Sequence, residues 1–216
     1  MSQQSDLNLK TYQPTCSIEA LKARAKLYQT IRTFFAERDV LEVETPIISQ
    51  AGVTDVHLAS VRALRHIQGE ERIQYLQTSP EFAMKRLLAS GSGPIYQICK
   101  VFRDEEHGRK HNSEFTMLEW YRPEFDLKDL MHETADLLHS CLHHRFDEIR
   151  PMILSYKHAF QDRLDINPLQ ASLQQLKDTA RRVGLTLDLG DDRLAYMDLL
   201  FSHFVEPSLG FDTPVF

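Results

Sequence analysis

The stretch PIYQICKVFR-DEEHGRKHN-SEFTMLEWYR, residues 94–122, decides the fold of this chain. Its two ends, 94–103 and 113–122, are rich in β-branched and aromatic residues, which favour strands. The residues between them are polar and charged, as expected of a surface loop. Because neighbouring strands joined by a short polar loop usually pair, this stretch predicts an antiparallel hairpin.

Segments with helical or strand patterns lie on both sides of the hairpin. Helices are predicted, from serine or aspartate caps and from apolar residues at helical spacing, over 17–39, 79–91, 126–142, 155–164, 172–183 and 192–205. Further strands are predicted over 40–48, around Val61 and over 72–78, with Pro46 ending the regular pairing of the first. We therefore expect an α+β fold, an antiparallel sheet flanked by helices and incomplete at its C-terminal edge.

Side-chain alternation divides the second hairpin strand into two faces. One face carries Phe115, Met117, Glu119 and Tyr121. A carboxylate among apolar residues is unfavourable unless it meets a cation or hydrogen-bond donors. Glu119 therefore belongs either to an internal salt bridge or to a site for a cationic ligand. Trp120 lies on the opposite face, where we expect core packing.

Cationic residues gather where the two hairpin strands meet the loop. Arg103 ends the first strand, and a guanidinium at a strand end can bind phosphate through two parallel hydrogen bonds. Loop cations such as His111 could hold further phosphates. A basic loop is often only a solvated surface, so the alternatives are a solvated loop and a nucleotide site without a glycine-rich segment.

Bulk composition excludes several classes of protein. Of 216 residues, 42% are apolar and 26% are charged, as in an ordinary globular domain. A formal net charge of −6 argues against sequence-independent binding of nucleic acid, although a local patch could still contact RNA. Three scattered cysteines without a CxxC pair argue against a disulfide framework or a zinc ribbon. Neither a signal-peptide core nor a membrane-length apolar run is present, so we expect a cytoplasmic protein without membrane contact.

The hairpin and its flanks resemble a known family. FRDEEHGRKHNSEFTMLEWY, residues 102–121, resembles motif 2 of class II aminoacyl-tRNA synthetases, and its FTMLEWY part resembles the lysyl branch. TSPE followed by MKRLL, within 78–88, resembles the amino-acid-binding segment of the lysyl enzymes. The first helix with VLEVETPII resembles motif 1, whose proline, here Pro46, lies at a dimer interface in that family. The resemblance implies a homodimer.

The resemblance also implies roles around ATP. Arg103 would bind the α-phosphate and stabilise charge while the carboxylate of the amino acid attacks it. Glu105 would recognise the adenine amino group, and Phe115 would stack on adenine. His111 and Asn112 would contact phosphate or ribose. Such adenylyl transfer needs positioning and charge stabilisation more than a covalent nucleophile.

A second set of implied roles concerns the amino acid. Ser79, Pro80 and Glu81 fall in the amino-acid-binding segment, with Glu81 near the α-amino group. Glu119 and Tyr121 would hold the side-chain ammonium of lysine. A buried carboxylate selects a lysine-like ammonium because leaving the carboxylate unpaired is unfavourable.

Two departures from lysyl-tRNA synthetases shape the expected function. Residues 1–16 form only a polar lead, too short for the usual anticodon-binding barrel, and this resembles the short paralogues that attach β-lysine to elongation factor P. Residues 17–216 then form a partial catalytic domain with motifs 1 and 2. Motif 3 of the family has a glycine-rich helix start, and the eight glycines of this chain include no GxGxG pattern. We expect the missing part to supply most ligands of Mg²⁺, no metal ligands in this chain, and little activity from this chain alone.

The expected function is ATP-dependent activation of lysine or (R)-β-lysine, followed by transfer to a lysine of elongation factor P. Two alternatives remain open. The first is a fragment of a lysyl-tRNA synthetase that charges tRNA. The second is a non-catalytic paralogue that acts as a binding module.

Overall fold

A computed structural model describes residues 14–104, 108, 111–143, 151–211 and 213–216. The chain forms two compact units, Met1–Leu130 and Met131–Phe216, and helix α3 (Leu127–Leu142) crosses their division. As predicted, Asp126 begins α3, and its carboxylate accepts hydrogen bonds from the amides of Lys128 and Asp129 at 2.7 and 2.9 Å. In the described ranges, no helix is both long and apolar enough to span a bilayer.

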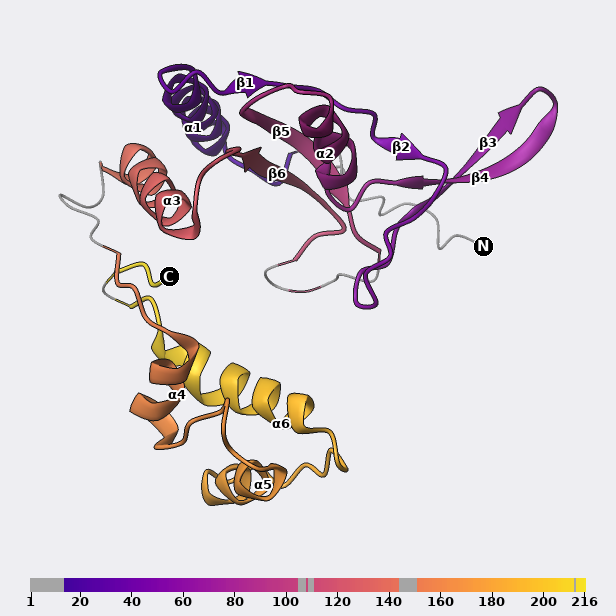
Figure 1. Ribbon diagram of the computed structural model, residues 1–216. Helices are drawn as coiled ribbons and strands as arrows, with labels where there is room; N and C mark the ends of the chain where they lie inside the picture. Colours follow the sequence, from indigo (N-terminus) through magenta and orange to yellow (C-terminus); the bar gives the residue numbers. More distant parts are fainter. Residues whose placement is uncertain (1–13, 105–107, 109–110, 144–150, 212) are drawn as a thin grey trace, which may run out of the picture. The chain divides into compact units, whose positions relative to one another are not determined.

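The first unit contains a three-stranded sheet in the order β1 (Leu41–Glu42), β5 (Ile95–Phe102), β6 (Glu114–Tyr121). Strands β5 and β6 pair antiparallel, which confirms the predicted hairpin (Figure 1). Strand β1, however, pairs with β5 in parallel, so the sheet is mixed and the prediction of a purely antiparallel sheet is wrong at this edge. A long excursion of the chain separates β1 from β5, which permits the crossover that parallel pairing requires.

Helix α1 (Ile18–Ala36) covers one face of this sheet. Its predicted cap is confirmed, because the Ser17 hydroxyl accepts a hydrogen bond from the amide of Ala20 at 3.1 Å. The ring of Phe35, which is fully buried, stacks on Tyr96 with centroids 4.4 Å apart and meets Trp120 at 5.7 Å. This packing confirms the core role predicted for Trp120 and leaves the opposite face of the sheet for other elements.

A second sheet has the order β2 (Ile48–Ser49), β4 (Glu70–Leu76), β3 (Arg62–Ile67). The single strand predicted over 40–48 is therefore wrong. Its two ends join different sheets as β1 and β2, and Pro46 lies between them, where a missing N–H does not interrupt a ladder. The strands predicted near Val61 and over 72–78 are confirmed as β3 and β4, with shifted ends.

Helix α2 (Glu81–Ala89) begins where predicted but not with the predicted cap. Pro80 occupies the cap position, and no side-chain hydrogen bond caps the helix there. Met84 anchors the helix with no exposed surface. Gly91 follows the helix with a φ of 84°, the left-handed conformation that glycine adopts most readily.

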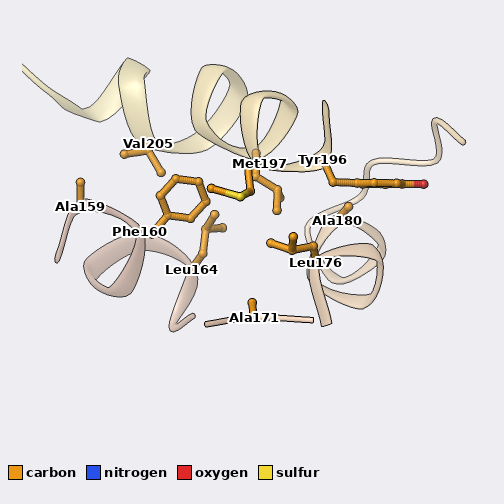
Figure 2. Packing of buried hydrophobic residues seen from close by; sticks show 10 residues of the cluster. Ala159, Phe160, Leu164, Ala171, Leu176, Ala180, Tyr196, Met197 and Val205 are labelled. Carbon is orange, nitrogen blue, oxygen red and sulfur yellow. The ribbon is translucent and has the colours of Figure 1, made fainter. Parts of the chain in front are cut away.

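The second unit is helical. It contains α4 (Tyr156–Leu164), α5 (Leu173–Arg182) and α6 (Arg193–Leu200), followed by a π-helical turn (Phe201–Val205) and a 3₁₀ turn (Glu206–Ser208). The three predicted helices are thereby confirmed. Figure 2 shows their shared core, in which Phe160, Leu176 and Val205 have no exposed surface. The burial of each such side chain contributes about 1.5–3 kcal/mol.

Candidate functional site

A carboxylate held by two hydroxyls is the centre of the candidate site. Ser79 donates a hydrogen bond to Oε2 of Glu119 at 2.6 Å, and Tyr121 donates one to Oε1 at 2.7 Å. The amide of Glu81, at the start of α2, donates to the Ser79 hydroxyl at 3.0 Å. Four residues that the sequence assigned to one site are therefore joined in one hydrogen-bond network.

The hydrogen-bond donors of Glu119 are neutral, and no cation of the described residues balances its charge. Burial raises the pKa of Tyr121 well above its ordinary value, and the hydrogen bond to Glu119 and the negative charges of Glu119 and Glu81 raise it further. Tyr121 therefore stays a neutral donor. Among the described residues no cation forms an ion pair with Glu119, so the internal salt bridge considered above is absent from that part of the chain. Its carboxylate is positioned by donors but not neutralised by them.

A cavity of about 800 Å³ lies beside the network. Predicted site residues Pro46, Ser79 and Glu81 line it, together with the segment 50–54 and part of α2. This volume falls in the usual range for small-molecule sites. The carboxylate of Glu81 also forms an ion pair with Lys85, one turn along α2. Pro80 is fully buried at the start of this helix.

Beneath the network, β5 contributes polar residues that the sequence reading missed. Gln97 is directly opposite Glu119 in the strand register and only 2% exposed. Its Oε1 accepts a hydrogen bond from the Thr45 hydroxyl at 3.0 Å, which ties the segment before Pro46 to the sheet. Applying the same alternation to 94–103 and pairing it with 113–122 would have placed Gln97 on the Glu119 face.

Cys99 lies on the same face, one alternation from Gln97. Burial and the negative charge of Glu119 raise the pKa of the Cys99 thiol to about 11, although hydrogen bonds from Gln77 and Gln97 act in the opposite direction. Cys99 is therefore a neutral thiol near pH 7.

The predicted nucleotide residues lie toward the loop end of the hairpin. The Cζ atom of Arg103 is 5.1 Å from the ring centroid of Phe115. Because Phe115 and Glu119 are four residues apart in β6, the Arg103 guanidinium and the Glu119 carboxylate share one side of the sheet. An aromatic ring beside a guanidinium fits a ligand with a flat ring and a phosphate.

The structure says less about the other residues predicted to contact the nucleotide. Glu105 lies outside the described residues. His111 and Asn112 are exposed just before β6, and His111 pairs with Gly108 only through the backbone, at 3.2 and 3.3 Å. Their contacts with phosphate or ribose stay predictions. In the described part of the chain, no three His, Cys, Asp or Glu side chains gather as metal ligands.

Comparison with known proteins gives relatives for most of the chain. Three proteins, each called elongation factor P–(R)-β-lysine ligase, are similar to it. The one from Photobacterium profundum is 51% identical over 210 residues, which cover 95% of this chain and 64% of the relative. The relative from Edwardsiella ictaluri is 48% identical, over 97% of this chain and 64% of the relative. The relative from Histophilus somni is also 48% identical, over 94% of this chain and 62% of the relative. The chain thus spans less than two thirds of these relatives.

A family model covers a similar range. It describes class II tRNA synthetases of the D, K and N group and matches residues 8–197. This range includes both hairpin strands, the Glu119 network and the cavity lining. The order of Arg103, Phe115 and Glu119 along the hairpin agrees with the match of this family model over most of the chain. The chain belongs to the class II tRNA synthetases of the D, K and N group.

Proposed function

We propose that this chain forms the substrate site of a ligase that activates lysine or (R)-β-lysine with ATP and transfers it to a lysine of elongation factor P. The observation that carries the proposal is the Glu119 carboxylate, which is held by Ser79 and Tyr121 beside a cavity of about 800 Å³. The relatives named as elongation factor P–(R)-β-lysine ligases support the acceptor.

The charge pattern of the site suits a substrate with two ammonium groups. Glu119 would bind the terminal ammonium, since its two oxygens are fixed by neutral hydroxyls. Glu81, which lines the cavity at the start of α2, would bind the second ammonium. A substrate without the terminal ammonium would leave Glu119 desolvated and unpaired, and such a mismatch is strongly disfavoured.

The nucleotide would lie farther along the same face. Adenine would stack on Phe115, and Arg103 would bind the α-phosphate and stabilise the negative charge that develops as the carboxylate of the substrate attacks it. Glu105, His111 and Asn112 complete this proposed set. Mg²⁺ would neutralise charge on the ATP phosphates when bound. These side chains position the reacting groups and need no covalent intermediate with the enzyme.

Substrate-dependent exchange of pyrophosphate into ATP tests the activation step, and it is measured on a version of the protein that includes the expected motif 3 part. We expect exchange with lysine or (R)-β-lysine and none above background with alanine. Glu119→Gln keeps the shape of the side chain but removes its charge, so KM for the amino acid rises about a hundredfold or more while KM for ATP changes little. Equal exchange with alanine, or equal changes in both KM values, contradicts the proposal.

The acceptor is tested separately. Purified elongation factor P and tRNA are each offered to the protein with radiolabelled substrate, and label in the protein acceptor is the expected result. Label in tRNA alone instead supports the tRNA-charging alternative. Intact binding of lysine and ATP without exchange supports a non-catalytic module.

A further inference from the structure

The hairpin of β3 and β4 extends away from the rest of its unit (Figure 1). The two strands pair in register from Arg62 with Tyr75 to Ile67 with Glu70. Gln68 and Gly69 close the hairpin with φ values of 54° and 81°, the positive values of a two-residue hairpin turn. We call this element the β3–β4 arm. Its register is fixed by the turn, so its faces are defined.

One face of the β3–β4 arm carries an unfavourable pair of like charges. Arg65 lies directly opposite Arg72, and both are exposed. Arg65 donates a hydrogen bond to Gln74 at 2.8 Å, and Arg72 forms an ion pair with Glu70 at 3.0 Å. Like charges directly opposite in a hairpin destabilise it. The ion pair with Glu70 offsets part of this repulsion, and a bound carboxylate would offset more of it.

The same face continues into the wall of the substrate cavity. Gln74, the residue that Arg65 contacts, lines the cavity, as does Leu76 two residues farther along β4. Arg72 is two residues from Gln74 toward the hairpin turn, about 7 Å along the strand. The arginine pair therefore lies just beyond the part of the cavity wall that Gln74 and Leu76 form.

Resting on the proposed function, we propose that the β3–β4 arm docks the protein acceptor, with Arg65 and Arg72 binding carboxylates on the surface of the acceptor. Arginine forms paired hydrogen bonds with carboxylates, so this contact fixes orientation as well as charge. An acceptor loop held on the arm directs its lysine past Gln74 into the cavity, where the activated substrate lies.

The composition of the β3–β4 arm favours a protein partner over RNA. Binding to a phosphate backbone requires many cations, whereas Glu70 and Glu71 accompany the arginines here and the chain has a net charge of −6. On the same face as the two arginines, Ala63 and Ile67 alternate with Arg65 along β3. A mixture of paired arginines and apolar side chains is typical of protein interfaces.

The double variant Arg65→Glu/Arg72→Glu tests the proposal. Calorimetric titration with elongation factor P should show about tenfold weaker binding, and KM for transfer to this acceptor should rise about tenfold with little change in kcat. Lysine-dependent exchange of pyrophosphate into ATP should be unchanged, which also shows that the variant is folded. The matched control is Arg62→Glu, because Arg62 is on the same strand but on the other face.

The outcomes separate the two proposals. If the unsubstituted protein that includes the expected motif 3 part shows no exchange, the proposed function fails, while the calorimetric titration still tests the β3–β4 arm. Binding of elongation factor P that is equally strong in the double variant overturns the docking role, as does an equal loss with Arg62→Glu. Loss of tRNA binding in the double variant, measured by filter retention, with unchanged acceptor binding would assign the arm to RNA instead.

Discussion

At the scale of single residues, the position of Ser79 shows how one hydroxyl connects a helix to a strand. The sequence predicted Ser79 as the cap of α2, a role that Pro80 takes without a side-chain hydrogen bond. The Ser79 hydroxyl accepts from the amide of Glu81 and donates to Glu119. It thereby aligns the start of α2 with a carboxylate far away in the sequence.

Ser79→Ala removes one of the two donors of Glu119. A hydrogen bond to a charged group contributes about 1.5–3 kcal/mol, so we expect KM for lysine to rise tenfold or more while KM for ATP stays nearly constant. Both constants are measured by pyrophosphate exchange. Ser90→Ala is the matched control, because the hydroxyl of Ser90 contacts only a backbone carbonyl at the other end of α2. A similar effect of both variants contradicts the role of Ser79.

At the scale of elements, Glu42 ties the short strand β1 to its neighbours through a cluster with Arg32 and Tyr96. Glu42 accepts hydrogen bonds from Arg32 in α1, at 3.1 Å, and from Tyr96 in β5, at 2.9 Å. The hydrogen bond from Arg32 lowers the pKa of Glu42, and its charge and the hydrogen bond from Tyr96 act in the same direction, against the effect of burial. This cluster links α1, β1 and β5.

The lowered pKa of Glu42 predicts a pH-dependent contribution to stability. Ionised Glu42 stabilises the fold above its unfolded pKa of about 4.3, and the contribution is lost as pH falls through the lower pKa of the folded state. Because the pair is partly exposed, we expect Glu42→Gln to lower the free energy of unfolding at pH 7 by about 1 kcal/mol or less. Urea unfolding at pH 7 and pH 3 should show the difference shrinking in acid. A constant difference contradicts the assignment.

The sequence predicted where helices and strands form better than it predicted which strands pair with one another. Local patterns are sufficient for α1, the β5–β6 hairpin and the helices of the second unit, since caps and periodicity are local. The parallel pairing of β1 and the division of 40–48 between two sheets depend on distant strands, which no local pattern reports. For the same reason alternation along one strand placed Glu119 and Tyr121 on one face, and the family resemblance supplied their expected roles. Gln97 and Thr45, which lie on other segments, were not found.

At the scale of the whole molecule, the motif 1 region leaves apolar side chains exposed. Ile18 and Leu21 of α1 are 59% and 47% exposed, and Leu41 of β1 is 58% exposed. These side chains lie in or next to the segment that resembles motif 1, whose proline, here Pro46, the resemblance places at a dimer interface. Exposed apolar side chains there support, as a proposal, association of two copies.

Leu21→Glu and Leu41→Glu should weaken such a dimer. Each places a charge where apolar contact is expected, and we anticipate at least a tenfold rise in the dimer dissociation constant, measured by sedimentation equilibrium. Leu64→Glu is the control, because Leu64 is 59% exposed but lies on the β3–β4 arm. Unsubstituted protein that sediments as a monomer at all concentrations tested would rule out this interface.

The parallel pairing of β1 with β5 has a consequence for the order of biosynthesis. Tyr96 follows Glu42 by 54 residues, so at about 5–20 residues per second the ribosome needs roughly 3–11 s to supply the partner strand. During that interval Phe35 has no aromatic ring from β5 on which to stack. The first sheet therefore closes late, after the β3–β4 arm and α2, whose contacts are local, have left the exit tunnel.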